Sequence, residues 1–296
     1  MKTVKYLAFL LSSAALCGTL YAQGMLEPHP YMREGVVDHH GTVATVRTDY
    51  AQPLCQAVIA IRQEYGWAVH YEAPPYQGKH DLMDTTNPSY RAAHPGAKVD
   101  LGPAGGAFQS TYPESPSVWH SPDMGQQVLE KVVSDYNQSG NPGHFAVRRL
   151  CDGSFDVIGD AIHDDAGANI PIRPVFDTPI NLARVARSRY DAVQAVLDAL
   201  SSKVGIKMYI YEGAYNVLSR ESTVIGAIAP ARDLLMQALD GSRLKWVWIL
   251  TYHPQQQTEP AEYCLGIFPV VRAEYDTSGR KHLTPVDPLH ITGGPR

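Results

Sequence analysis

The sequence predicts an α+β fold in which two related groups of helices and strands follow each other along the chain. Apolar residues at helical spacing are followed by a glycine and a strand-like alternation, and this order returns 139 residues later. Hydrophobic residues make up 44% of the chain, enough for packed cores, and the length of 296 residues suggests roughly two domains. We therefore expect two small units, each a short sheet with two helices packed on one face.

Residues 1–22 have the layout of a cleaved secretory signal peptide. Lys2 and Lys5 precede an apolar stretch, and Ala22 supplies a small residue at the expected cleavage site. No later segment has the ~20 uninterrupted apolar residues that a membrane-spanning helix needs. The mature chain is therefore expected to be periplasmic or secreted, without a transmembrane segment.

Cys17 offers an alternative, because a lipidated cysteine stands at the end of such an apolar stretch. The residue before it is Leu16, where lipoprotein processing generally uses a small side chain. Cleavage near Ala22 is therefore the favoured interpretation, and a lipoprotein is the alternative.

The mature chain is acidic. Of the 25 basic residues, two lie in the leader, which leaves 23 basic against 30 acidic residues and a formal net charge of −7. A nucleic-acid partner is not expected from that balance. Cys55, Cys151 and Cys264 remain in an oxidising compartment, where at most one intramolecular disulfide can form, and the sequence leaves their pairing open.

The first unit is assigned to residues 43–160, after an N-terminal extension at residues 23–42. A strand at residues 43–46 is expected to precede a helix whose apolar face is formed by Leu54, Val58, Ile61 and Tyr65. Gly66 then ends this helix, and residues 67–71 alternate as in a half-buried strand.

A second helix and a hairpin complete this unit. The apolar face of the helix is formed by Leu129, Val132, Val133 and Tyr136. Phe145 and Val147 alternate in the strand that follows, and Asp152-Gly153 is typical of a hairpin turn into a last strand near residues 155–157.

The second unit, residues 178–272, repeats this order. The shift of 139 residues leads to a helix face and a strand formed by Val193, Leu197, Leu200, Val204, Gly205, Ile206, Met208 and Ile210. A shift of 102 residues leads to a second helix face and strand, in which Val247 and Ile249 correspond to Phe145 and Val147. Further strands are expected at residues 180–182, 222–228 and 264–270.

The drop from a shift of 139 to one of 102 residues indicates an insertion of 37 residues in the first unit. We place it within residues 77–122, which are rich in proline and glycine. The polar residues 161–177 are interpreted as a linker, and residues 273–296 as a C-terminal tail.

The second unit, with AVLDALSSKVGIKMYIY, STVIGAIAPARDLLMQAL and LKWVWIL in this order, resembles the short N-terminal domain of secretins and TonB-dependent transducers. The first unit resembles a diverged and interrupted copy, so that the resemblance covers about two thirds of the chain. It implies a domain that docks partners or builds rings in the periplasm, and a partner in a secretin or TonB-linked system. No outer-membrane barrel or secretin core follows in this sequence, so a self-contained exported protein is expected.

The common catalytic and cofactor motifs do not occur: there is no G-x-S-x-G, H-E-x-x-H, phosphate loop or paired C-x-x-C. No catalytic residue, cofactor or metal is therefore predicted. Asp38-His39-His40 is interpreted as a solvated terminal segment. A second polar cluster is assigned to the hydrated linker, because it lacks the ligand spacing of a calcium loop: Asp160, His163, Asp164 and Asp165.

The candidate contact residues are aromatic: Tyr76, Tyr90, Tyr112, Trp119, Trp246 and Trp248. The first four lie in the insertion or at its start, and exposed aromatics on long loops bind peptides, glycans or proteins. The alternative is an irregular loop whose Trp119 packs into the first unit. Trp246 and Trp248 lie opposite Val247 and Ile249, and one of these faces is expected under the helices, the other open or covered by the first unit.

The expected function is that of a non-catalytic binding and assembly protein of the bacterial cell envelope, acting through protein–protein contacts. Addition of a partner strand to a sheet edge is one physical route to such binding. The alternative is a secreted hydrolase or carbohydrate-active enzyme with its site in the insertion, using His80, Asp81 and Asp84.

Overall fold

The computed structural model describes residues 35–49, 51–114, 122–213, 215–255 and 259–286. The signal peptide, Cys17, Trp119 and most of the N-terminal extension lie outside these residues. Helices alternate with strands that form several sheets, which confirms the α+β class.

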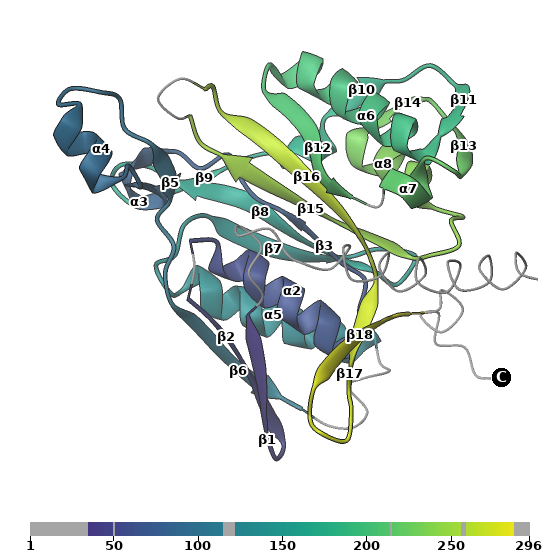
Figure 1. The fold of residues 1–296 in the computed structure, drawn as a ribbon, viewed down its shortest axis with the longest axis horizontal. Coiled ribbons are helices and arrows are strands. Elements are labelled where there is room, and N and C mark those ends of the chain that lie inside the picture. The colour runs from purple at the N-terminus through teal and green to yellow at the C-terminus, as the bar shows by residue number, and fades with distance from the viewer. Residues whose placement is uncertain (1–34, 50, 115–121, 214, 256–258, 287–296) are drawn as a thin grey trace, which may run out of the picture. The chain divides into compact units, whose positions relative to one another are not determined.

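The largest sheet is built from both parts of the chain (Figure 1). Its strands are β3 (Val69–Glu72), β7 (His144–Arg149), β8 (Phe155–His163), β9 (Asn169–Pro171), β12 (Lys207–Gly213), β15 (Trp246–His253) and β16 (Glu262–Pro269). Six of them form one path in the order β12–β16–β15–β3–β8–β7, and β9 pairs with the end of β8. The elements expected as two sheets therefore share one sheet, because β15 and β3 pair with each other.

Four longer helices pack on this sheet: α2 (Pro53–Tyr65), α5 (Pro122–Asn137), α6 (Arg189–Val204) and α8 (Ala231–Leu239). The first two contact β3, β7 and β8, whereas α6 contacts β12, and the two pairs lie on opposite faces of the sheet (Figure 1). The sequence explains where α2 and α6 stop, since Gly66 and Gly205 adopt φ values of 71° and 72°, a conformation that glycine enters without strain.

Shorter elements surround this core. The short helices are α3 (Gly78–Asp81), α4 (Pro88–Ala93), η3 (Val175–Asp177) and α7 (Tyr215–Leu218). A three-stranded sheet has the order β1 (Val36–His40), β2 (Val43–Thr48) and β6 (Phe108–Pro113). Two-stranded pairs are β4 (Leu82–Asp84) with β5 (Leu101–Pro103), β10 (Pro179–Asn181) with β14 (Ile228–Pro230), β11 (Val185–Ser188) with β13 (Ser222–Ile225), and β17 (Val271–Tyr275) with β18 (Lys281–Pro285).

Several segments differ from what the sequence suggested. The strands expected near residues 43, 180 and 222 exist, but they belong to the smaller sheets. Residues 77–122 include β6, whose alternate side chains are buried against the first part of the chain. Residues 161–177 include the end of β8, β9 and the fully buried Phe176, whereas residues 163–173 are exposed or half-buried. The start of the tail forms β17, which packs against α2.

The two groups of three strands are related by a half-turn about a line across the strands. In each group the first strand is parallel to the second, and the third is antiparallel to it: β12–β16–β15 and β3–β8–β7. Because β15 runs parallel to β3, the second group points in the opposite direction to the first. The same half-turn places α6 and α8 on one face and α2 and α5 on the other.

This half-turn changes the side-chain correspondence expected for β15. Trp248 faces α8, with the guanidinium carbon of Arg232 5.3 Å from its ring centroid. Val247 faces the other side, where it packs with Ala68 and Val270. The residue that takes the place of Phe145 in the second group is thus Trp248 rather than Val247.

A buried ionic cluster joins the two groups of strands. The Arg232 guanidinium donates to Glu72 of β3, to Asp156 of β8 at 2.9 Å and to Asp177 of η3 at 2.8 Å. The second oxygen of Glu72 accepts the Phe176 N–H at 3.1 Å. A single side chain from α8 therefore neutralises carboxylates from the other group of strands.

Burial shifts the proton affinities in this cluster. It raises the pKa of Asp156 to about 6 and raises the pKa of Glu72, in both cases against the opposing pull of Arg232. Burial also lowers the pKa of His70 to about 3, so its ring is neutral and its Nδ1 accepts the Trp248 N–H at 3.2 Å. The His70 and Trp248 rings are stacked, with centroids 5.0 Å apart.

We expect Arg232→Met to lower the free energy of unfolding by about 3–5 kcal/mol, because it leaves buried carboxylates without their counter-ion. Urea unfolding at pH 7 measures this, with Arg220→Met as the control on an exposed arginine. The control should stay within about 0.5 kcal/mol of the wild type. A loss of the same size in both variants would contradict the role given to Arg232.

We expect Asp156→Asn to change the pH dependence of stability. A carboxyl group whose pKa rises from 3.8 to about 6 on folding stabilises the fold below its ordinary pKa, and this contribution is lost as pH rises to about 6. Asparagine does not ionise, so the variant does not lose this contribution. From pH 4 to pH 6, the free energy of unfolding of the variant should therefore increase relative to that of the wild type by up to about 3 kcal/mol. Urea unfolding at pH 4, 5, 6 and 7 checks this, and Asp198→Asn, at an exposed site, should follow the wild-type profile. Equal pH slopes in all three proteins would exclude the assignment.

Candidate functional site

Strand β7 ends the sheet path and pairs on one side only, with β8. Leu150 N–H donates to Ser154 O at 2.9 Å, so the even-numbered residues of this strand face β8. The backbone groups of Phe145, Val147 and Arg149 therefore face away from the sheet. Within the described chain, these outward groups of Val147 and Arg149 have no backbone partner.

Asn137, the last residue of α5, bonds to the first of these outward residues, Phe145. Its side-chain oxygen accepts the Phe145 N–H at 3.0 Å, and its side-chain nitrogen donates to Phe145 O at 2.9 Å. The amide thus bonds to the strand as a neighbouring strand would. The open part of the edge begins one pair of residues later, at Val147.

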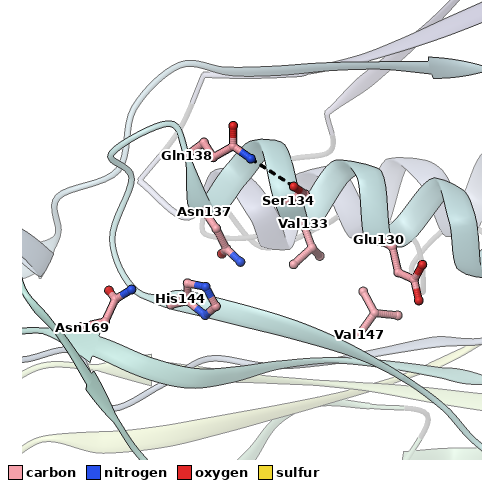
Figure 2. Close-up of a pocket in the computed structure, with 8 residues that line it drawn as sticks. All are labelled: Glu130, Val133, Ser134, Asn137, Gln138, His144, Val147 and Asn169. Atoms are coloured by element: carbon pink, nitrogen blue, oxygen red, sulfur yellow. Dashed lines mark hydrogen bonds between the residues drawn. The ribbon is translucent and has the colours of Figure 1, made fainter.

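A hollow of about 430 Å³ lies beside this edge, between α5 and β7 (Figure 2). It is lined by Glu130, Val133, Ser134, Asn137, Gln138, His144, Val147 and Asn169. Val133 and Val147 supply an apolar patch, and the remaining side chains are polar. His144 is positioned by Asp160, with 2.6 Å between its Nδ1 and a carboxylate oxygen.

The arginines next to the hollow have carboxylate partners. Arg148 pairs with Asp177 at 2.7 Å, and Arg149 pairs with Asp123 at 2.5 Å. Charged side chains of this kind are typical of edge strands, where they limit unspecific pairing with other chains. The site therefore combines a short open backbone edge, a polar hollow and flanking ion pairs, an arrangement suited to holding an extended segment.

The structure buries most of the aromatic residues predicted as contacts. Tyr76 lies edge-on to Tyr252 with ring centroids 6.3 Å apart, and Tyr112 of β6 contacts the Tyr65 hydroxyl. Both are 1% exposed, so they belong to the core rather than to a contact surface. Tyr90 on α4 is exposed and stacks on His94, while Trp119 lies outside the described residues.

Trp246 and Trp248 are also buried. Trp246 donates its indole N–H to Ser242 Oγ at 2.8 Å, and Trp248 is enclosed by His70, Phe176 and Arg232. They are not exposed because the second pair of helices covers their face and the first group of strands continues the sheet beside them.

The residues of the hydrolase alternative have separate partners. Asp81 is buried and accepts from the Gly143 N–H at 2.8 Å and from the His163 N–H at 2.9 Å. Asp84 is exposed and pairs with Arg91. His80 is exposed beside Gly167. Asp81 thus ties α3 to β8 and to the loop before β7, which is a structural role.

A second polar cluster surrounds His39 of β1. Its ring nitrogens lie 2.7 Å from Glu114 and 3.1 Å from Glu64, and Tyr65 and Tyr275 donate to these two carboxylates. Burial lowers the pKa of His39, but the Glu114 hydrogen bond and the two negative charges outweigh it, so the pKa is raised. The segment expected to be solvated is therefore fixed by hydrogen bonds.

The remaining predictions concern cysteines, metals and membranes. Cys55, Cys151 and Cys264 are free, and burial raises the thiol pKa of Cys55 to about 12 and that of Cys264 to about 11. Among the described residues, no three His, Cys, Asp or Glu side chains are placed to hold a metal ion. None of the helices described is both long and apolar enough to cross a lipid bilayer.

Comparison with known proteins returns no matching family, no matching characterised protein and no matching solved structure.

Sequence reasoning missed Asn137, His144 and Val147 as site residues, although it placed a helix and a strand correctly around them. One signal was available: Arg148-Arg149 at the end of a short strand is a pattern that marks an edge. The bonding of Asn137 to Phe145 has no such signal, because it depends on how α5 meets β7.

We expect Asn137→Ala to lower the free energy of unfolding by about 1–3 kcal/mol, because both backbone groups of Phe145 lose their partner. Urea unfolding measures the loss, and amide hydrogen exchange should show faster exchange at Phe145. Gln138→Ala, which removes an exposed contact to Ser134 on the same helix, is the control and should change stability by less than about 0.5 kcal/mol. Unchanged exchange at Phe145 in Asn137→Ala would contradict the assigned contact.

Proposed function

We propose that this protein is an exported, non-catalytic binding protein of the bacterial cell envelope that holds an extended segment of a partner protein along β7. The observation that carries the proposal is the open backbone edge at Val147 and Arg149 beside the α5–β7 hollow. Strand addition supplies main-chain hydrogen bonds at such an edge, and side-chain pockets supply selectivity.

The hollow indicates the kind of segment that fits. Because Val147 lines the hollow, alternate side chains of an added strand enter it, next to Val133. Small apolar side chains suit this patch. Polar side chains suit the rim formed by Glu130, Gln138 and Asn169.

The setting of the proposal comes from the sequence. The leader at residues 1–22 supports export, either with cleavage near Ala22 or, as the alternative, with lipidation at Cys17. The resemblance of residues 178–272 to the short domain of secretins and TonB-dependent transducers supports a partner in one of these systems.

Val147→Pro tests the proposed edge. Its N–H faces away from β8, so proline removes the outward donor and leaves the pairing with β8 in place. Immobilised residues 23–296 should retain an envelope protein from extract of the source cells, and the variant should retain at least tenfold less. The control is Val37→Pro, on another edge strand, which should capture as the wild type does, because Glu114 N–H donates to Thr42 O and the Val37 N–H therefore faces away from β2.

The partner found in this way should then be tested with purified components. Its binding should protect the Val147 amide from hydrogen exchange in the wild type. Equal capture by the wild type and Val147→Pro, or a partner that leaves this amide unprotected, would exclude β7 as the binding edge.

A further inference from the structure

The six-strand path has two open ends, β7 and β12, and the pairing of β15 with β3 shows how two such edges join in this fold. Strands related by the half-turn occupy equivalent places in the two groups. Their rows of paired residues correspond: Tyr71, Val157 and Val147 in one group, and Ile210, Leu265 and Leu250 in the other. By this correspondence of rows, β7 is the equivalent of β15, and β12 is the equivalent of β3.

The backbone groups at the internal junction define what each edge offers. Ala73 N–H donates to Leu250 O at 2.9 Å, so Leu250 faces β3 and the odd-numbered residues of β3 face β15. By the equivalence of rows, Val147 is the outward residue of β7 and Ile210 the outward residue of β12. At Val147 and Ile210 the two open ends therefore present the groups that meet inside the molecule, although β12, unlike β3, has a bulge directly after Ile210.

The internal junction is also short. It pairs only Ile249 with Tyr71 and Leu250 with Glu72. The next outward N–H, that of Trp248, is taken by the His70 side chain instead of by backbone. Phe145 is the equivalent of Trp248, and its backbone is likewise taken by a side chain, that of Asn137.

Strand direction agrees with this pairing. Along the path, β12 and β16 run one way, β15, β3 and β8 run the other way, and β7 returns to the direction of β12. A copy of the chain in the same orientation, shifted along the sheet, therefore brings its β12 parallel to β7. Its α6 and α8 then lie on the face opposite α2 and α5, as they do within one chain.

We propose that β12 of a second copy occupies the β7 edge, so that copies join head to tail into a longer sheet. This inference rests on the proposed binding edge at β7 and names its partner. Transposing the pairing of Leu250 with Glu72 places Val147 opposite Glu212 of the next copy, because Glu212 pairs with Gly266 as Glu72 pairs with Ile158. Tyr211 is the extra residue of a bulge in β12 and is 42% exposed in the single chain.

The joint between copies is weaker than the internal one. The internal junction has the Arg232 cluster, in which Glu72 lies directly opposite Leu250. At the joint between copies β12 has a bulge between Ile210 and Glu212, so the ladder is interrupted at the row that corresponds to Glu72. Association is therefore reversible and depends on protein concentration, as for other small contacts.

Sedimentation velocity of residues 23–296 from about 5 μM to about 1 mM covers the range expected for a weak contact of this size. The mean mass of the wild type should rise with concentration and pass that of a dimer, because each added copy leaves an open end. Val147→Pro blocks the β7 end and Ile210→Pro the β12 end, and each variant alone should stay monomeric. An equimolar mixture of the two should give dimers and nothing larger, because only one joint can form. The control Val37→Pro should assemble as the wild type does.

Circular dichroism establishes whether Ile210→Pro is folded, since its side chain is partly buried. Should that variant unfold, Tyr211→Lys replaces it as the β12 block, because it places a charged side chain in the bulge of the edge strand next to Ile210. A wild type that stays monomeric throughout, single variants that assemble, or a mixture that forms no dimers would each overturn the inference.

These outcomes are distinct from failure of the proposed function. A monomeric wild type whose Val147→Pro variant loses an envelope partner overturns head-to-tail joining and leaves the binding edge intact. Assembly blocked by Val147→Pro, together with unchanged capture of an envelope protein, overturns the external partner at β7 and supports joining of copies.

Discussion

The central sheet depends on the guanidinium group of Arg232. It reaches from α8 across the joint between the two groups of strands and meets carboxylates on β3, β8 and η3. Buried carboxylates of this kind are stable only when charge and hydrogen bonds compensate them. The joint therefore requires that α8 keeps Arg232 next to β3. The guanidinium also lies over the ring of Trp248 in the neighbouring strand β15, and this contact helps to position α8. The continuity of the sheet and the exposure of its two ends both follow from this contact.

The half-turn between the two groups gives the molecule its two open ends. A pairing of equivalent edges would have used both copies of one edge and left two open ends of the same kind. Here unlike edges meet, β15 with β3, so one edge of each kind is left over. This is a heterologous contact within one chain, and such contacts between chains continue until something blocks an end. Asn137 and the paired arginines beside β7 restrict the open stretch and so limit unspecific pairing.

Much of the fold was accessible from sequence because it rests on local patterns. Helical spacing and a glycine stop predict α2 and α6, and the Asp152-Gly153 turn predicts the β7–β8 hairpin. The features that could not be predicted from sequence depend on pairing between strands that are far apart in the chain. The alternation of Phe108, Ser110 and Tyr112 is a strand pattern, but the prolines and glycines around it favour a loop, so β6 is not predicted from this segment alone. The half-turn exchanged the faces of β15, which no local pattern encodes, and so the tryptophans expected at a surface lie in the core.

Strand β3 lies in the middle of the sheet, but its neighbours come from distant parts of the chain. Glu72 and Arg232 are 160 residues apart, and His70 and Trp248 are 178 residues apart. A nascent chain therefore completes β3 only after most of its length has been synthesised, and until then one edge of this strand and its buried carboxylates lack their partners. Contacts of such sequence separation slow folding and lengthen the life of incomplete states. Delayed folding of this kind suits the proposed export, for which a chain has to remain unfolded until it reaches the export machinery.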